Sequence, residues 1–307
     1  MNFKKPKFWD KKKVSTWAII LLPLNLIYKL FFLIKKISKP SKRFKVPIIC
    51  VGNIYLGGTG KTPLVREIFN ILKSLNKNPA FIKKPYSYLD DEIKMLKATG
   101  KVFTSKNRIK SISSSIEQNH NVAILDDGFQ DFSIKLDFSI LCFNSKQLIG
   151  NGFVIPSGPL RENFSSIKRT DCIFINGDKN LNFETKIKKI KKDIKIFYSK
   201  YKIKNVEKFK NKNIIAFAGI GNPENFFELL KQNNLKIEKT ISFPDHHNYT
   251  EKDFNYLTKS QNDVFFLTTE KDYYRLNDEM KKKCNFIEVD LEIEKKNDFI
   301  NLIKYKL

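Results

Sequence analysis

Residues 46–62 read VPIICVGNIYLGGTGKT, and this stretch decides the fold. The apolar run at residues 46–51 predicts a short buried strand, and the glycines after it predict a tight turn. From Pro63 to Leu75 apolar residues recur every three or four positions, which predicts an amphipathic helix. A glycine-rich turn between a strand and a helix lets backbone N–H groups surround phosphate oxygens at the helix N-terminus. The stretch therefore predicts a phosphate-binding loop.

The loop residues themselves suggest nucleotide chemistry. They are Gly57, Gly58, Thr59, Gly60, Lys61 and Thr62. We expect Lys61 to reach the β- and γ-phosphates of a nucleotide, and the Thr62 hydroxyl to bind Mg²⁺. The strict form of this motif has glycine where the chain has Tyr55, so the loop is a variant. Partitioning-type ATPases carry an extra lysine where this chain has Leu56, which counts against that class.

A pair of carboxylates follows a second apolar run. Residues 122–125 read VAIL and predict a buried strand, which Asp126 and Asp127 follow directly. P-loop enzymes hold or order magnesium with a carboxylate at the tip of a strand beside the phosphate-binding loop. Thr62, Asp126 and Asp127 are therefore the expected magnesium residues.

The rest of the chain alternates short apolar runs with helical stretches. In the first part strands are expected at 80–82, 138–142 and 172–175; in the second, strands at 214–218, 264–267 and 286–289 and a helix at 223–231. This alternation predicts an α/β fold with a P-loop NTPase-like, mostly parallel sheet and helices on both faces. A lysine-rich stretch between Phe183 and Lys212 predicts a junction. The expected domains are residues 41–205 and a smaller C-terminal α/β domain, 206–307.

Residues 1–40 predict a separate, membrane-associated segment. Residues 17–34 read WAIILLPLNLIYKLFFLI and have lysines on both sides. Pro23, Asn25 and Lys29 disfavour a helix that crosses the bilayer, and no small-residue cleavage site of a signal peptide follows. An interfacial helix, with its lysines on phosphate headgroups, is the favoured interpretation. A spanning helix and a helix buried in the protein core are the alternatives.

The composition explains the net charge of +25 without a nucleic-acid partner. Of 57 basic residues only six are arginine: Arg43, Arg66, Arg108, Arg161, Arg169 and Arg275. Abundant lysine, asparagine, isoleucine and phenylalanine indicate a bias toward A/T-rich codons as much as selection for a polyanion. We therefore expect no specific nucleic-acid binding. The four cysteines are widely scattered, which argues against a zinc site or a disulfide framework.

Six stretches, in order, resemble the tetraacyldisaccharide 4′-kinase family. They are residues 52–63 (GNIYLGGTGKTP), 126–130 (DDGFQ), 156–162 (PSGPLRE), 217–223 (FAGIGNP), 243–247 (FPDHH) and 269–272 (TEKD). The resemblance runs from the N-terminal apolar segment to about Leu276. One such motif would say little about the substrate, whereas six in the family's order are specific.

The resemblance implies a reaction and a location. These kinases transfer the γ-phosphoryl group of ATP to the 4′-hydroxyl of a tetraacylated glucosamine disaccharide 1-phosphate, in lipid A biosynthesis. ATP and Mg²⁺ are the implied cofactors, and the lipid substrate and the membrane surface are the implied partners. A peripheral monomer at the cytoplasmic face of the bacterial inner membrane is therefore expected. The alternative is a membrane-recruited P-loop ATPase that acts on a protein partner.

The resemblance also assigns residues to roles. Asp91 aligns with the family's catalytic aspartate and His246 with its partner histidine, with Asp90 as the alternative in a neighbouring register. Together with Lys61 and Asp127 they form the expected catalytic set. Gln130 is expected at the nucleotide, and the expected substrate residues are Asn53, Arg161 and Glu162.

The chain departs from the family pattern at several positions. Lys84 stands in place of an arginine, Ile93 in place of a proline and Asp131 in place of a histidine, and the loop between Tyr86 and Asp91 is short. These departures point to a divergent acceptor site and leave the phosphate-binding loop untouched.

Overall fold

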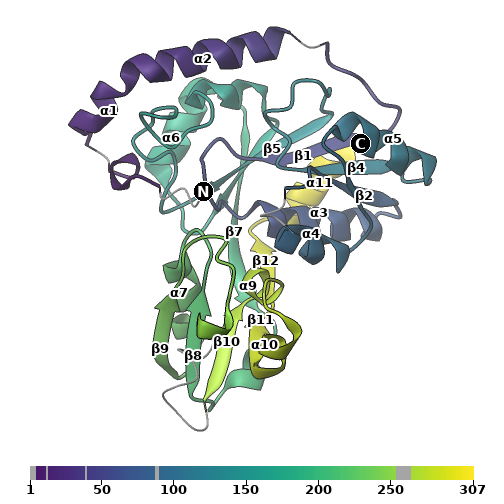
Figure 1. Cartoon of the computed structure of the whole chain (residues 1–307). Coiled ribbons are helices and arrows are strands. Elements are labelled where there is room, and N and C mark those ends of the chain that lie inside the picture. The colour runs from purple at the N-terminus through teal and green to yellow at the C-terminus, as the bar shows by residue number, and fades with distance from the viewer. Residues whose placement is uncertain (1–4, 12, 39, 87–89, 254–263) are drawn as a thin grey trace. The chain divides into compact units, whose positions relative to one another are not determined.

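The computed structural model describes residues 5–11, 13–38, 40–86, 90–253 and 264–307 (Figure 1). Its contacts divide the chain into two compact units. The larger unit consists of Phe3–Lys84, Gly100–Lys200 and Glu292–Leu307, and the smaller is built on Pro85–Thr99 and Tyr201–Leu291. The domains expected from the sequence, residues 41–205 and 206–307, differ from these units chiefly in two segments. Residues 85–99 belong to the smaller unit and residues 292–307 to the larger.

The larger unit contains most of an eight-stranded sheet of order β12-β7-β6-β5-β1-β4-β2-β3. Its strands are β1 Ile48–Gly52, β2 Pro79–Lys83, β3 Val102–Thr104, β4 Val122–Asp126, β5 Phe138–Asn144, β6 Cys172–Asn176, β7 Lys195–Ile203 and β12 Val289–Ile293. The central strand β1 pairs in parallel with β4 and β5 and is buried along its whole length. A strand buried on both faces requires the continuous apolar run that the sequence shows here.

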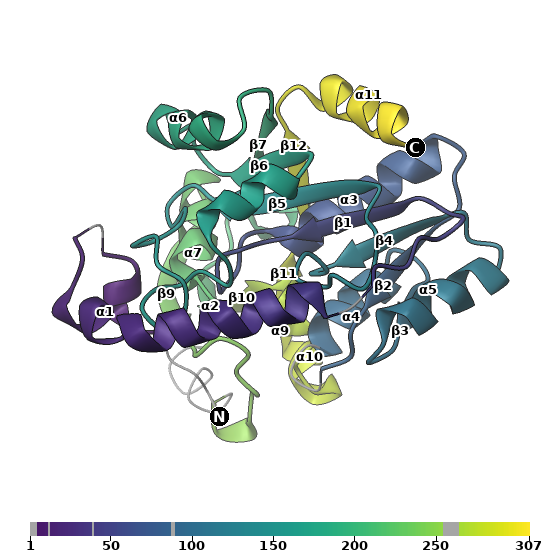
Figure 2. The ribbon, with the colours of Figure 1, turned by 90° about the horizontal axis from the view of Figure 1, so that it is seen from above.

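Helices cover both faces of this sheet, as expected for the α/β fold, which is confirmed (Figure 2). They are α3 Lys61–Ser74, α5 Arg108–Glu117, α6 Leu181–Ile190 and α11 Lys296–Lys306. The helix α3 buries one apolar stripe, including Leu64, Ile68 and Leu72, which is the period that the sequence predicted.

The smaller unit is a four-stranded parallel sheet of order β11-β10-β8-β9. Its strands are β8 Ile214–Ala218, β9 Ile237–Ser242, β10 Phe265–Thr269 and β11 Cys284–Ile287, and its helices are α4 Asp90–Lys97, α7 Pro223–Gln232, α9 Glu270–Tyr273 and α10 Asp278–Lys283. Phe217, Leu230 and Leu267 are fully buried in it. The second α/β set expected from the sequence is therefore present.

One expectation about strands is wrong in detail. The single strand expected at 286–289 is two strands, since β11 ends at Ile287 and β12 begins at Val289 in the other sheet. The lysine-rich stretch between Phe183 and Lys212 contains a boundary between the two units, at Lys200 and Tyr201. It also contains β7, which no expected strand covers and which lies between β12 and β6. Only the middle of β7, at Phe197–Ser199, forms a continuous buried run, so its exposed lysines concealed the strand.

The N-terminal apolar segment forms two helices, α1 Thr16–Ile20 and α2 Leu22–Ile37. No helix among the described residues is long and apolar enough to cross a membrane. Most of the large apolar side chains of α1 and α2 are at least half exposed, among them Trp17, Ile20, Leu24, Leu26, Ile27, Leu30, Phe31 and Ile34. In these helices only Ala18 and Asn25 are buried. The alternative of a helix buried in the protein core is therefore wrong.

The side of α2 opposite its exposed apolar face contacts the rest of the larger unit through polar and aromatic side chains. The Asn25 side-chain amide donates to the carbonyl of Val154, and the Tyr28 hydroxyl donates to the carbonyl of Arg161 at 3.1 Å. Phe32 packs edge-on against Phe132, with ring centroids 5.4 Å apart. The polar residue Asn25 within the apolar run is thus a docking contact, and the exposed face is left apolar.

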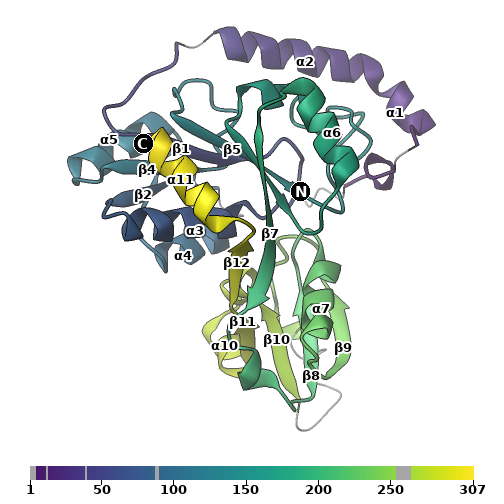
Figure 3. The same ribbon diagram turned by 180° about the vertical axis from the view of Figure 1, so that it is seen from behind.

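The C-terminal helix α11 belongs to the larger unit (Figure 3). Its main buried side chain is Phe299. This ring is fully buried and packs against Phe174 of β6 and Phe197 of β7, with centroids 4.7 and 5.2 Å away. The contact explains why the last segment of the chain belongs to the larger unit.

We expect Phe299→Ala to lower the free energy of unfolding by about 3–5 kcal/mol, because it removes a buried ring and leaves a cavity. Urea unfolding followed by circular dichroism measures the change. Tyr305→Ala on the same helix is the control, since Tyr305 is 84% exposed and its loss should change stability by no more than about 0.5 kcal/mol. Equal effects of the two substitutions would contradict the packing described for α11.

Candidate active site

The glycine-rich loop connects β1 to α3, as predicted. Gly60 precedes the first residue of α3 with φ of 86°, a left-handed conformation that favours glycine. At Gly58 an added Cβ would meet nothing within 4 Å, so the backbone is open to a ligand there. Lys61 and Thr62 occupy the first turn of α3, where backbone N–H groups and the helix dipole favour an anion.

Asn53 holds this loop from inside the protein. Its side chain is fully buried, and its amide nitrogen donates to the carbonyls of Tyr55 (2.7 Å) and Gly57 (3.1 Å) and to the hydroxyl of Thr59 (3.2 Å). The sequence places Asn53 among the substrate residues, but these contacts are made within the loop. The geometry favours a role for Asn53 in shaping the loop.

Asp127 lies at the turn after β4 and pairs with two cations. Its carboxylate accepts from Arg161 Nη1 at 2.9 and 3.0 Å, and Lys61 Nζ lies 3.8 Å away. Partial burial raises the pKa of Asp127, but Lys61 and Arg161 together outweigh it and hold the pKa well below its usual range. Asp127 is thus an anion that links the phosphate-binding lysine to Arg161.

Asp126 has a different environment from its neighbour. It is buried, and one oxygen accepts from the Lys83 ammonium at the end of β2. The other oxygen, Oδ1, is buried without a hydrogen-bond partner among the described residues. An unpaired carboxylate oxygen is a suitable ligand for a hard cation such as Mg²⁺.

A magnesium ion would not find a complete protein cage here. Within the described part of the chain there is no group of three or more histidine, cysteine or acidic residues that could hold a metal. Magnesium is usually bound by one or two carboxylates together with waters and substrate phosphates. The hydroxyl of Thr62 and the free oxygen of Asp126 fit that mode, whereas both oxygens of Asp127 are engaged by Arg161.

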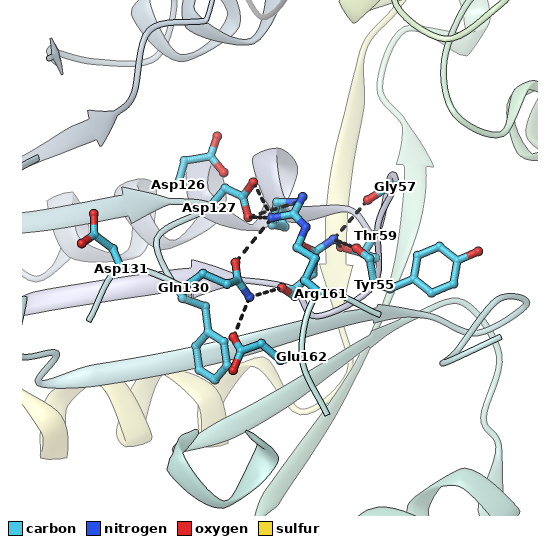
Figure 4. Close-up of polar contacts among 12 residues, drawn as sticks. Tyr55, Gly57, Thr59, Asp126, Asp127, Gln130, Asp131, Arg161 and Glu162 are labelled. Carbon is cyan, nitrogen blue, oxygen red and sulfur yellow. Dashed lines mark hydrogen bonds and ion pairs between the residues drawn. The ribbon is translucent and has the colours of Figure 1, made fainter. Parts of the chain in front are cut away.

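Gln130 and Glu162 connect the turn after β4 to the base of the loop (Figure 4). Gln130 Nε2 donates to the carbonyl of Asn53 at 3.0 Å and to Glu162 Oε1 at 2.9 Å. Gln130 Oε1 accepts from Arg161 Nη1 at 3.4 Å. The structure therefore brings Asn53, Lys61, Asp127, Gln130, Arg161 and Glu162 into one polar network.

Two arginines of this network were not predicted from the sequence. Arg169 donates to Glu162 Oε1 at 2.6 Å, and its guanidinium lies 3.8 Å from the centre of the Phe129 ring. Arg108 donates to the carbonyl of Asp127 at 2.7 Å. A signal was available, because arginine is rare in this lysine-rich chain and its planar guanidinium makes paired hydrogen bonds that lysine cannot reproduce.

The smaller unit holds a second cluster around Asp91, which is 3% exposed. Asp91 Oδ2 accepts from Arg275 at Nε (2.7 Å) and also at Nη2, and Oδ1 accepts from the backbone N–H of Glu92 at 2.8 Å. His246 Nδ1 lies 3.9 Å from Asp91 Oδ2 and 3.3 Å from Arg275 Nη2. The family resemblance pairs Asp91 with His246, and in the structure the two residues are neighbours.

The histidine of this cluster is disposed to be neutral. Burial, with the Lys271 ammonium 3.4 Å from Nε2, lowers the pKa of His246 below that of an ordinary histidine. The adjacent His247 faces another group, stacking on Phe243 and pairing with Asp253 at 3.1 Å. The backbone of His246 is left-handed, with φ of 58°, which turns consecutive histidines toward different neighbours.

The two clusters divide the predicted residues between the units. The nucleotide, magnesium and expected substrate residues lie in the larger unit, and Asp91 and His246 lie in the smaller. Asp90, the alternative to Asp91, is exposed, whereas Asp91 makes the contacts with Arg275. The structure therefore favours Asp91 as the functional residue of the pair.

Comparisons with known proteins show the family of the chain. The family model for tetraacyldisaccharide-1-P 4′-kinase matches residues 17–307. A tetraacyldisaccharide 4′-kinase from Pelagibacter ubique is 42% identical, over 99% of this chain and 98% of the relative. One from Rickettsia canadensis is 35% identical, over 95% and 94% of the two chains.

A solved structure shares the fold. The crystal structure of LpxK from Aquifex aeolicus in complex with ATP matches with a TM-score of 0.74 and 24% identity, covering 94% of this chain and 99% of that one. Near-complete coverage in both directions means that the two units and their order along the chain are common to both proteins. From the family model and the full-length relatives, the chain belongs to the tetraacyldisaccharide-1-P 4′-kinase family.

Proposed function

We propose that this kinase transfers the γ-phosphoryl group of ATP to the 4′-hydroxyl of a tetraacylated glucosamine disaccharide 1-phosphate, in lipid A biosynthesis. The observation that carries the proposal is the network at the phosphate-binding loop, in which Asp127 joins Lys61 to Arg161. Phosphoryl transfer depends mainly on positioning and on stabilising charge, and this network supplies cations in fixed positions. The names of the full-length relatives supply the acceptor.

The larger unit provides the nucleotide site in this proposal. The loop residues Gly57–Thr62 bind the phosphates, and Lys61 neutralises charge on the β- and γ-phosphates. Thr62 and Asp126 would hold Mg²⁺, which would neutralise further phosphate charge when bound. Asp127 orients Lys61 and Arg161, and Gln130 and Glu162 hold Arg161 in that position.

The smaller unit provides the proton acceptor. A carboxylate can take the proton of a sugar hydroxyl late in transfer, provided that it is ionised. Arg275 donates to Asp91 from both Nε and Nη2, which holds this carboxyl group in position. His246, held neutral before transfer, adds no second positive charge beside Arg275. It can accept or relay the proton, and it becomes a cation while it carries it. Asp91 and His246 therefore act as one unit.

The exposed face of α1 and α2 provides the membrane contact. Trp17, Leu26, Ile27 and Phe31 are each more than 60% exposed, and Lys35 and Lys36 lie in the last turn of α2. Such a helix lies in the interface, with its apolar face in the acyl region and its lysines at phosphate headgroups. We place the protein as a peripheral monomer on the cytoplasmic face of the bacterial inner membrane, where a lipid substrate and ATP meet.

Label transfer from [γ-³²P]ATP to a tetraacyl disaccharide 1-phosphate, read by thin-layer chromatography, tests the reaction. We expect wild type to give a labelled lipid, and Lys61→Ala to lose about 10³-fold or more of kcat, because a cation at the transferred phosphate is removed. Lys73→Ala is the matched control, an exposed lysine on the same helix. Near-wild-type turnover of Lys61→Ala at saturating ATP would contradict the assignment. ATP hydrolysis that needs a protein partner and labels no lipid would favour the alternative ATPase.

The base is tested by comparing neighbouring aspartates. We expect Asp91→Asn to lower kcat about 10²- to 10⁴-fold with little change in the KM for ATP, because the proton acceptor is lost. Asp90→Asn is the control and should keep full activity, since Asp90 is exposed. Adding His246→Ala to Asp91→Asn should cost little more, because residues that act as one unit lose activity non-additively. Full activity of Asp91→Asn would remove Asp91 from the mechanism.

Membrane association is tested on the folded protein. Trp17→Ser, Ile27→Ser and Phe31→Ser together should weaken co-sedimentation with phosphatidylglycerol-containing vesicles at least 10-fold, because each buried apolar side chain contributes about 1.5–3 kcal/mol. Leu181→Ser with Tyr305→Ser is the control, since both residues are exposed outside these helices. Equal vesicle binding by the triple variant and wild type would place the membrane contact elsewhere.

A further inference from the structure

A carboxylate in the larger unit, that of Asp131, lies close to two cations. Lys84 Nζ lies 3.7 Å from Asp131 Oδ2. The same oxygen accepts from Arg108 Nη1 at 2.9 Å. The Asp131 carboxylate is therefore held between an ammonium and a guanidinium group.

Arg108 connects this carboxylate to the turn after β4. Its second nitrogen, Nη2, donates to the main-chain carbonyl of Asp127 at 2.7 Å. The guanidinium is almost fully buried, and its Nε has no hydrogen-bond partner among the described residues. Asp131 and the Asp127 carbonyl are therefore the two acceptors shown to hold Arg108 in place.

The turn that Arg108 holds is conformationally demanding. Asp127 has φ of 61°, a left-handed conformation that costs energy for a residue other than glycine. Gly128 packs closely on Leu125 and Cys50, so an added Cβ would lie 2.9 Å from the nearest side-chain atom. The direction of the Asp127 carboxylate, which binds Arg161 and Lys61, depends on this turn.

We propose that Asp131 is a positioning residue for phosphoryl transfer: by binding Arg108 it fixes the backbone of Asp127, and through it the carboxylate that orients Arg161 and Lys61. Asp131 itself touches neither nucleotide nor acceptor in this assignment. The inference deepens the proposed function and rests on it. Lys84 has the secondary role of balancing part of the negative charge of Asp131.

Asp131→Asn tests the inference, because it keeps the shape of the side chain and removes its charge. We expect kcat to fall about 10- to 100-fold, since small displacements of positioned groups reduce rates on this scale. The KM for ATP should change less than about 3-fold, because the Asn53 contacts that shape the loop are kept. Asp131→Glu, which retains the carboxylate, should recover at least half of the lost kcat on a logarithmic scale.

Arg108→Lys identifies the route. Lysine lacks the planar guanidinium whose two nitrogens reach Asp131 and the Asp127 carbonyl, so this variant should lose kcat as Asp131→Asn does. The double variant should be no worse than the poorer single variant. Lys84→Met should stay within about 3-fold of wild type. Additive losses, or a loss in Lys84→Met equal to that in Asp131→Asn, would overturn the route through Arg108.

Asp171→Asn is the control for a merely structural ion pair. Asp171 lies in the same unit and pairs with Lys306 at 2.6 Å, so its loss should lower the melting temperature and leave kcat unchanged. An equal fall in kcat in both variants would overturn the inference.

Hydrogen exchange gives a readout that does not need lipid kinase activity. Backbone amides at residues 127–131 should exchange faster in Asp131→Asn than in wild type, and those at Gly57–Thr62 should not. Unchanged exchange at 127–131 would overturn the inference, whether or not wild type phosphorylates the lipid. Absence of labelled lipid with wild type, together with faster exchange in Asp131→Asn, would instead overturn only the proposed function.

Discussion

The paired contact between Arg161 and the Asp127 carboxylate is the interaction on which the rest of the nucleotide site depends. Asp127 is presented by a left-handed turn at the end of β4, and Arg161 by a segment whose backbone N–H binds the carbonyl of Ile54 at 2.7 Å. Because β1 and β4 are neighbours, the loop after one strand and the turn after the other meet at the same edge of the sheet. This ion pair and the hydrogen bond to Ile54 together connect three separate segments of the chain.

Arginine usage shows how selectively these contacts are built. Four of the six arginines lie in the two clusters: Arg108, Arg161 and Arg169 in the larger unit and Arg275 in the smaller. Three of them bind a carboxylate and a backbone carbonyl at once, which are Arg108, Arg169 and Arg275. In a chain whose composition favours lysine, arginine is kept where a planar fork must reach two acceptors. The net charge of +25 indicates little about function, whereas the positions of these four arginines mark the two polar clusters.

Much of the fold could be predicted because its central strands are continuous apolar runs. Residues 214–218 were predicted as a strand and form β8 over the same range, and the phosphate-binding loop lies where its glycines indicate. The strand β7 could not be found in the same way, since lysines interrupt its apolar run. The pair of strands at 284–293 could not be separated either, because adjacent runs of one chain carry no mark of the sheet that each one joins.

The Asp91 cluster shows what a single sequence could not give. Asp91 and Arg275 are 184 positions apart, and neither residue type nor spacing indicates that they pair. They meet because the segment at 85–99, inserted between β2 and β3 of the larger unit, belongs to the smaller unit with residues 201–291. The contacts that hold Asp91 and lower the pKa of His246 therefore come from one unit, and the contacts that shape the phosphate-binding loop come from the other. The contacts described for the two clusters have no residue in common, so a substitution in one cluster can be interpreted without assuming a change in the other.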